Sequence, residues 1–178
     1  MKEAPRAMAT WIGTLARGGV LRSVTEEAGV AVAAYVVGED RLSELRQFMS
    51  HQPPEVVKRE QKAAIDACIW MAQADRKLDS TERELLERMV DASGLDYATQ
   101  EALVASIDAP SSIEDVEQQL QHPVLRELLL ALAWELALVD GRVAEGEKDF
   151  YTGLAERLSI EPARAEAIKR AVSDQVLE

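Results

Sequence analysis

The chain has few cysteines, glycines, prolines and aromatic residues. Only one of its 178 residues is a cysteine, Cys68, so an intramolecular disulfide is excluded. There are 9 glycines and 6 prolines, and aromatic residues make up 4%. Because 47% of the residues are hydrophobic and Ala, Leu and Glu recur throughout, the composition favours an all-α protein with a core of its own.

Long apolar segments are also absent. The best candidate runs from Gly29 to Gly38, which is too short to span a bilayer. The N-terminal residues lack the basic-then-apolar order of a signal peptide. We therefore expect a cytoplasmic protein with no direct membrane insertion.

Positively charged residues are also few relative to acidic ones. The chain has 20 Lys and Arg against 32 Asp and Glu, which gives a net charge of −12 and a pI of about 4.7. Binding to nucleic acid or anionic lipid depends on Lys and Arg, so neither partner is expected. An acidic surface keeps a protein soluble, and an acidic cleft would also concentrate cations.

The usual signatures of enzymes are missing. Gly18-Gly19 is not followed by the Lys-Ser/Thr of a phosphate loop, and neither Gly-x-Ser-x-Gly nor Glu-x-x-His occurs. His51 and His122 each lie near a proline turn and are interpreted as ordinary loop residues, and Cys68 as a buried structural thiol. A hydrolase with paired carboxylates would need two acids with separated pKa values, which spacing cannot show. We expect a protein that is not an enzyme.

The apolar spacing and the breakers predict a chain of helices. They are expected over residues 4–17, 20–38, 41–49, 55–74, 80–92, 97–107, 113–121, 124–139, 144–158 and 161–176. The segment 124–139 is apolar nearly all round, as in a buried helix. Pro53-Pro54 marks the clearest boundary, which divides an N-terminal helical extension, 1–52, from a duplicated helical domain, 53–178.

The duplication is seen in two stretches 65 positions apart, residues 74–83 and 139–148. Each has an Asp, an apolar residue three positions later, a Glu seven positions later and then a basic residue. The acids are Asp75 and Glu82 in the first copy, Asp140 and Glu147 in the second. An offset that preserves both acids and core positions indicates an internal repeat.

The Glu and Asp residues of this motif need different explanations. Glu82 and Glu147 are expected in the first turn of a helix, where the helix dipole stabilises a carboxylate by about 0.3–1 kcal/mol. Asp75 and Asp140 are expected at the C-terminal ends of long helices, where the dipole disfavours negative charge. Either backbone N–H groups of the next helix compensate, or a divalent cation such as Ca²⁺, Mg²⁺ or Mn²⁺ lies between Asp and Glu.

The motif is not an EF-hand, because Lys77 and Arg142 stand where that loop needs oxygen ligands. One turn alone offers few ligands. The two turns could instead converge on one shared site.

The duplicated motif resembles that of the tellurite-resistance TerB-like family. Ser93-Gly94-Leu95-Asp96 and the segment 158–163 also match the Leu-Gly-Leu-Asp-Pro-Ala turn typical of that family. The resemblance covers about residues 56–176. It implies an all-α bundle of two repeated helix-turn-helix units, in bacterial cytoplasmic proteins linked to tellurite resistance and stress responses, some of them associated with membranes through partners.

In that family the acidic residues are thought to bind divalent metal, which the resemblance carries onto Asp75, Glu82, Asp140 and Glu147. One departure concerns the glycine after the Asp, which is replaced by Arg76 in the first copy. If that position needs a positive φ, an arginine there costs about 1 kcal/mol or more.

Two functions follow as hypotheses. The first is a non-enzymatic stress-response module whose acidic turns bind a divalent cation and whose surface engages a protein partner. The second is a metal-free helical adaptor or oligomerisation domain in which the turns are structural helix caps. Cation binding predicts that the four carboxylates converge on solvent, whereas capping predicts that each accepts hydrogen bonds from backbone N–H groups.

Overall fold

The computed structural model describes residues 27–73, 80–109, 120–138 and 145–177, and residues 78, 112, 114, 118 and 143 between them. Over these residues the chain is all-α, as predicted, and no strand occurs among them. The helices are α2 (Glu27–Val37), α3 (Glu39–His51), α4 (Pro54–Ala72), α5 (Ser80–Ala92), α6 (Tyr97–Ser106), α8 (Pro123–Leu138), α9 (Glu145–Arg157) and α10 (Pro162–Leu177). The helix predicted over 4–17 and most of the one predicted over 113–121 lie outside the described residues.

Glycine and proline set several helix boundaries at the positions that the sequence indicates. Gly38 separates α2 from α3 with a φ of 97°, a conformation that favours glycine. Three helices begin with a proline, Pro54 in α4, Pro123 in α8 and Pro162 in α10. Proline suits this first position because its missing N–H would have no partner inside the helix and its φ is already helical.

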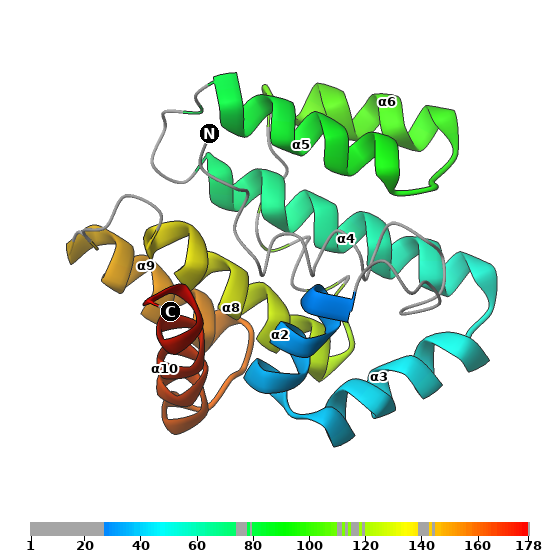
Figure 1. The fold of residues 1–178 in the computed structure, drawn as a ribbon. Helices are drawn as coiled ribbons and strands as arrows, with labels where there is room; N and C mark the ends of the chain where they lie inside the picture. Colours follow the sequence, from blue (N-terminus) through cyan, green and yellow to red (C-terminus); the bar gives the residue numbers. More distant parts are fainter. Residues whose placement is uncertain are drawn as a thin grey trace.

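The helices form a bundle around α4 and α8 (Figure 1). α4 contacts α5 and α6 on one side and α8 on the other, and α8 also contacts α2, α3, α9 and α10. The prediction that 124–139 is a buried helix is confirmed, because Val124, Leu125 and Leu130 are fully buried. The hydrophobic core therefore runs along both faces of α4 and all round α8.

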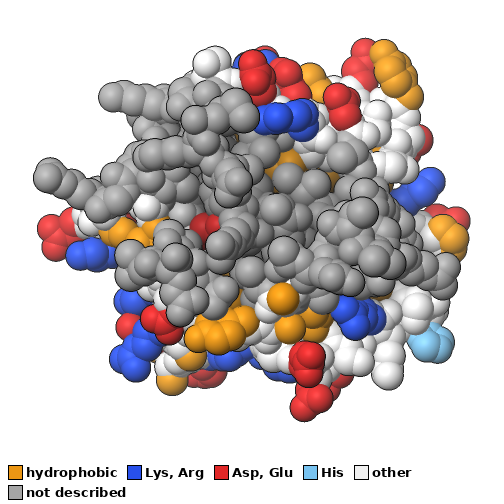
Figure 2. Space-filling model, viewed as in Figure 1, with side chains coloured by type: hydrophobic (Ala, Val, Ile, Leu, Met, Phe, Trp, Pro, Cys, Tyr) orange, Lys and Arg blue, Asp and Glu red, His pale blue; other side chains and the backbone are white. Residues whose placement is uncertain are grey.

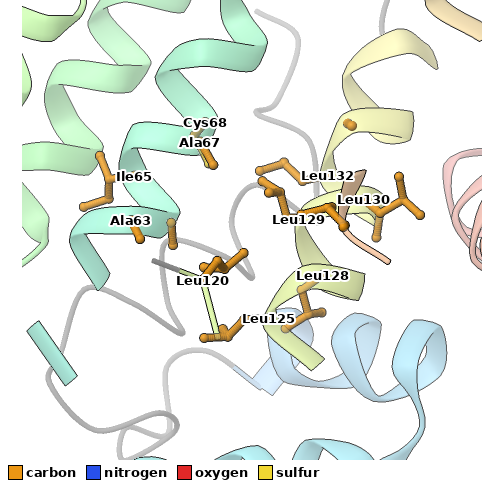
Figure 3. Packing of buried hydrophobic residues seen from close by; sticks show 14 of the residues in the cluster. Ala63, Ile65, Ala67, Cys68, Leu120, Leu125, Leu128, Leu129, Leu130 and Leu132 are labelled. Carbon is orange, nitrogen blue, oxygen red and sulfur yellow. The ribbon is translucent and has the colours of Figure 1, made fainter. Parts of the chain in front are cut away.

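The contact between α4 and α8 is made by small and branched apolar side chains (Figure 3). Ala67 and Cys68 project from α4 towards Leu129 and Leu132 of α8, whereas Ile65 projects to the other side of α4. Cys68 is 1% exposed, which confirms the interpretation of a buried structural thiol.

The described part of the N-terminal region shares this core. α2 contacts α8 and α10, and α3 contacts α8. Ala33, Val37, Leu42 and Leu45 are all buried in the same cluster as the core residues of α8. The division of the chain at residues 52 and 53 stays a prediction.

Helix bounds recur at the predicted offset. α5 and α9 each have 13 residues and begin 65 positions apart, at Ser80 and Glu145. α6 and α10 also begin 65 positions apart, at Tyr97 and Pro162. These bounds are what two repeated helix-turn-helix units would produce, and the duplication itself stays a prediction. None of the helices just described is long and apolar enough to cross a membrane.

Candidate functional site

Of the four predicted acidic residues, the structure describes the side chain of Glu147 alone. Asp75 and Asp140 lie outside the described residues, between α4 and α5 and between α8 and α9. Glu82 is the third residue of α5, although its side chain is not described. Glu147 is the third residue of α9, is half-buried, and has an interaction partner within the fold. Both Glu residues therefore lie in a first helical turn, as predicted.

The helices that flank the two acidic turns meet at one end of the bundle. The ring of Trp70, in the last turn of α4, stacks on that of Phe150 in α9, with centroids 5.0 Å apart and planes inclined by 26°. Phe150 lies one helical turn after Glu147. In Figure 1 the C-terminal ends of α4 and α8 and the N-terminal ends of α5 and α9 lie at the same edge of the molecule. The described helix ends that precede and follow the two acidic turns therefore lie at one end of the bundle.

No metal cluster is assembled by the described side chains alone. Among them, no three or more His, Cys, Asp or Glu residues are grouped closely enough to hold a metal ion. Since Asp75 and Asp140 are not among these side chains, the predicted combination of Asp and Glu stays a prediction.

A second cluster of charges lies at the opposite end of α8 and centres on Glu127. This residue is only 5% exposed, and its carboxylate accepts hydrogen bonds from Arg41 of α3 and from Arg164 of α10. The Nε and Nη2 atoms of Arg164 lie 3.0 and 2.6 Å from the same carboxylate oxygen, Oε2. Three helices are thereby joined through one buried carboxylate.

Arg164 also binds the C-terminal end of α2. Its Nη2 atom donates to the carbonyl oxygens of Val36 and Val37, at 3.4 and 3.2 Å. The last carbonyls of a helix have no partner inside that helix, and a cation near them is favourable to the helix dipole. The pair of Arg164 and Glu127 therefore fixes α2, α8 and α10 relative to one another.

Glu60 of α4 binds the backbone of the segment that leads into α8. It is fully buried, and both carboxylate oxygens lie 3.2 Å from the backbone N–H of Gln121, which donates to them. Burial raises the pKa of Glu60, and the hydrogen bond from Gln121 works in the opposite direction. A carboxylate from α4 thus accepts a backbone N–H of the turn before α8, 61 residues away.

His122 has a more definite role than that of an ordinary loop residue. Its Nδ1 atom accepts the backbone N–H of Val124 at 3.3 Å, so the side chain caps α8. Its ring packs on Phe48 of α3, with ring centroids 4.7 Å apart. Burial lowers the pKa of His122, and the nearby Arg41 lowers it further, while Glu44 raises it. The neutral ring is the form that can accept this hydrogen bond.

Sequence reasoning missed Glu127, Glu60 and their partners. One signal was present, because Glu127 is a charged residue on a helix predicted to be apolar nearly all round. A charge at such a position is rarely buried without a partner. The partners themselves carry no local pattern that would identify them.

The charges on the described surface are mixed. On the face shown in Figure 2, Lys and Arg side chains alternate with Asp and Glu around the part that is described. The described part of this face therefore carries no continuous basic patch.

The sequence matches the model of a protein family. Its description reads "Protein of unknown function (DUF533)", and the match covers residues 4–172. The match therefore includes most of the N-terminal region that the resemblance in the sequence did not cover. No curated protein and no solved structure matches.

Proposed function

Because the chain belongs to the DUF533 family, which is a TerB-like family, we propose that it is a non-enzymatic stress-response module of the tellurite-resistance type. In this proposal the two acidic turns bind divalent cations in the cytoplasm, and the surface of the bundle engages a protein partner. The ligands are Asp75, Glu82, Asp140 and Glu147, one Asp and one Glu from each turn.

The observation that carries the proposal is the stacking of Trp70 on Phe150. It brings the end of α4, which leads into the first acidic turn, against the start of α9, which follows the second. Two turns that each offer few ligands can then contribute to one ion, or to two ions close together. Carboxylate and carbonyl oxygens are the ligands that hard divalent cations prefer.

The test is calorimetric titration of chelator-stripped protein with Ca²⁺, Mg²⁺, Mn²⁺ and Zn²⁺. One double variant carries Asp140→Ala and Glu147→Ala, and another carries Asp75→Ala and Glu82→Ala. A control double variant carries Asp91→Ala and Glu101→Ala, which removes the same two residue types from exposed positions on α5 and α6. We expect saturable binding by the parent and the control, and its loss in the motif variants.

The stoichiometry separates the two arrangements of the site. One ion per chain, lost in either motif variant, indicates a site shared by both turns. Two ions per chain, with one lost in each variant, indicate a separate site in each turn.

The metal-free adaptor is the second candidate, and capping by carboxylates elsewhere in the chain favours it. Asp96 accepts the backbone N–H of Thr99 at 3.1 Å and caps α6, and Glu60 accepts the backbone N–H that precedes α8. Glu147 also has a partner within the fold. If no ion gives heat and the motif variants are only less stable than the control, the turns are structural caps and the cation proposal fails.

A further inference from the structure

A cavity of about 250 Å³ opens between the start of α8, the turn that joins α9 to α10, and α3. Arg41, Arg126 and Arg164 line it from three separate helices, together with Glu127, Ser159 and Glu161. Pockets for drug-sized ligands are usually about 300–1,000 Å³, so this one suits a small molecule or a single functional group. It is separate from the acidic turn that follows α8, because Arg126 and Leu138 are about 18 Å apart along the helix axis.

Arginine predominates in this pocket although the chain as a whole carries a net charge of −12. Glu127 is shared by Arg41 and Arg164. Arg126 instead donates to backbone carbonyls, from Nε to Leu120 at 2.7 Å and from Nη1 to Leu158 at 3.4 Å. These carbonyls hold the guanidinium of Arg126 in place, and its hydrogen bonds do not go to Glu127. The charge of Arg126 is also attracted by the buried carboxylate of Glu60.

Hydrogen bonds within the fold already orient the guanidinium groups of Arg41 and Arg164. Glu127 fixes Arg41 and Arg164, and Arg164 is fixed a second time by the carbonyls of Val36 and Val37. A guanidinium that is already held loses little conformational entropy when it binds an anion. Its planar set of N–H donors also matches the oxygens of a phosphate or carboxylate.

We propose that this pocket binds a small oxyanion, specifically a phosphate group, either as the free ion or as a phosphomonoester. Arg126 provides a guanidinium that Glu127 does not hold, Arg41 contributes from the rim, and Glu127 acts as a positioning residue that holds the other two guanidinium groups. Glu161, which is exposed at the mouth of the pocket, opposes anion binding by its charge.

The experiment is titration of the full chain with inorganic phosphate, followed by two-dimensional NMR at constant ionic strength set with chloride. Glycerol phosphate is titrated in parallel, so that the free ion and a monoester are compared. The variants are Arg126→Gln, Arg41→Gln and Glu161→Gln. The matched control is Arg170→Gln, which removes an arginine with the same loss of charge from α10, where the side chain is 76% exposed and pairs with Glu166.

We expect saturable shifts in residues around the pocket, affinity about tenfold weaker in Arg126→Gln, and parental affinity in Arg170→Gln. Glu161→Gln should bind about twofold more tightly, which keeps the proposal testable if an arginine variant fails to fold. Tighter binding of glycerol phosphate would identify a phosphomonoester as the ligand, and tighter binding of phosphate would identify the free ion. The proposal is overturned if shifts do not saturate, or if Arg126→Gln and Arg170→Gln weaken binding equally.

Discussion

Gly94 and Ser159 lie 65 positions apart and share an unusual backbone conformation, with φ angles of 67° and 57°. Each follows the end of a helix, α5 or α9. After α9 the N–H of Ile160 donates to the carbonyl of Ala155 at 2.9 Å, which is the bond that ends a helix in a left-handed residue. Glycine is the residue best suited to this position, and it is present at residue 94 but not at residue 159.

Ser159→Gly should therefore stabilise the protein. A residue with a side chain in the left-handed region is strained by about 1–2 kcal/mol, and glycine avoids the strain but loses more entropy on folding. We expect a gain of about 0.5–1 kcal/mol in the free energy of unfolding, measured by urea denaturation without phosphate. Gly94→Ser is the reciprocal test and should destabilise by a similar amount; a gain in both variants would contradict the explanation.

Glu127→Ala should weaken the bundle without opening a large cavity. The substitution leaves Arg41 and Arg164 without their carboxylate, but their side chains are 35% and 33% exposed and remain partly hydrated. We expect a loss of about 2 kcal/mol, below the range seen when a fully buried charge loses its partner. Glu87→Ala is the control, because its pair with Arg83 lies on the surface and should contribute at most about 0.5 kcal/mol. Equal losses in the two variants would show that the Glu127 cluster has no special role.

His122 should make stability depend on pH near neutrality. Burial lowers its pKa from the ordinary value of 6.5, so the unfolded chain takes up a proton more readily than the folded one. The contribution of this group is present above pH 6.5 and is lost as the pH falls through 6.5 to the lower folded-state value. Protonation also removes the acceptor for the N–H of Val124.

The measurement is the free energy of unfolding from pH 7.5 to pH 5 in two variants, His122→Asn and His51→Asn. These are the two histidines of the chain. Asparagine is a good N-cap, so His122→Asn keeps an acceptor for Val124 while it removes the titrating ring. We expect a flatter pH dependence in His122→Asn than in the parent, and parental behaviour in His51→Asn. A slope that His122→Asn leaves unchanged would assign the dependence to other groups.

Phe150→Ala should weaken the contact between the end of α4 and the start of α9. Phe150 is half-buried and stacks on Trp70, so its removal loses both apolar contact and the stacking geometry. We expect the free energy of unfolding, measured by thermal or urea denaturation, to fall by about 2 kcal/mol. This is less than the cost of about 3–5 kcal/mol for a Phe→Ala change in a fully buried core, because Phe150 is only half-buried. Tyr97→Ala removes an aromatic residue that is 78% exposed and should change stability by less than about 0.5 kcal/mol.

The sequence by itself determined that the described residues are helical and approximately where several of the helices begin or end. Proline at residues 54, 123 and 162 and glycine at residue 38 restrict the backbone locally, so their effect does not depend on distant parts of the chain. The burial of α8 was equally readable, since a helix that is apolar nearly all round is unstable in water unless other helices cover it. The acidic composition and the motifs at a 65-residue offset were also plain in the sequence.

Tertiary structure alone decided the partners of Glu127 and Glu60. Glu127 pairs with Arg41, 86 residues away, and with Arg164, 37 residues away, while Glu60 accepts a hydrogen bond from Gln121. A single arginine or glutamate on a helix looks the same in sequence whether it faces solvent or a buried partner, and helical periodicity reports only which face it occupies. Its partner is set by how α2, α3, α4, α8 and α10 pack against one another, and that packing depends on contacts between residues far apart in the chain.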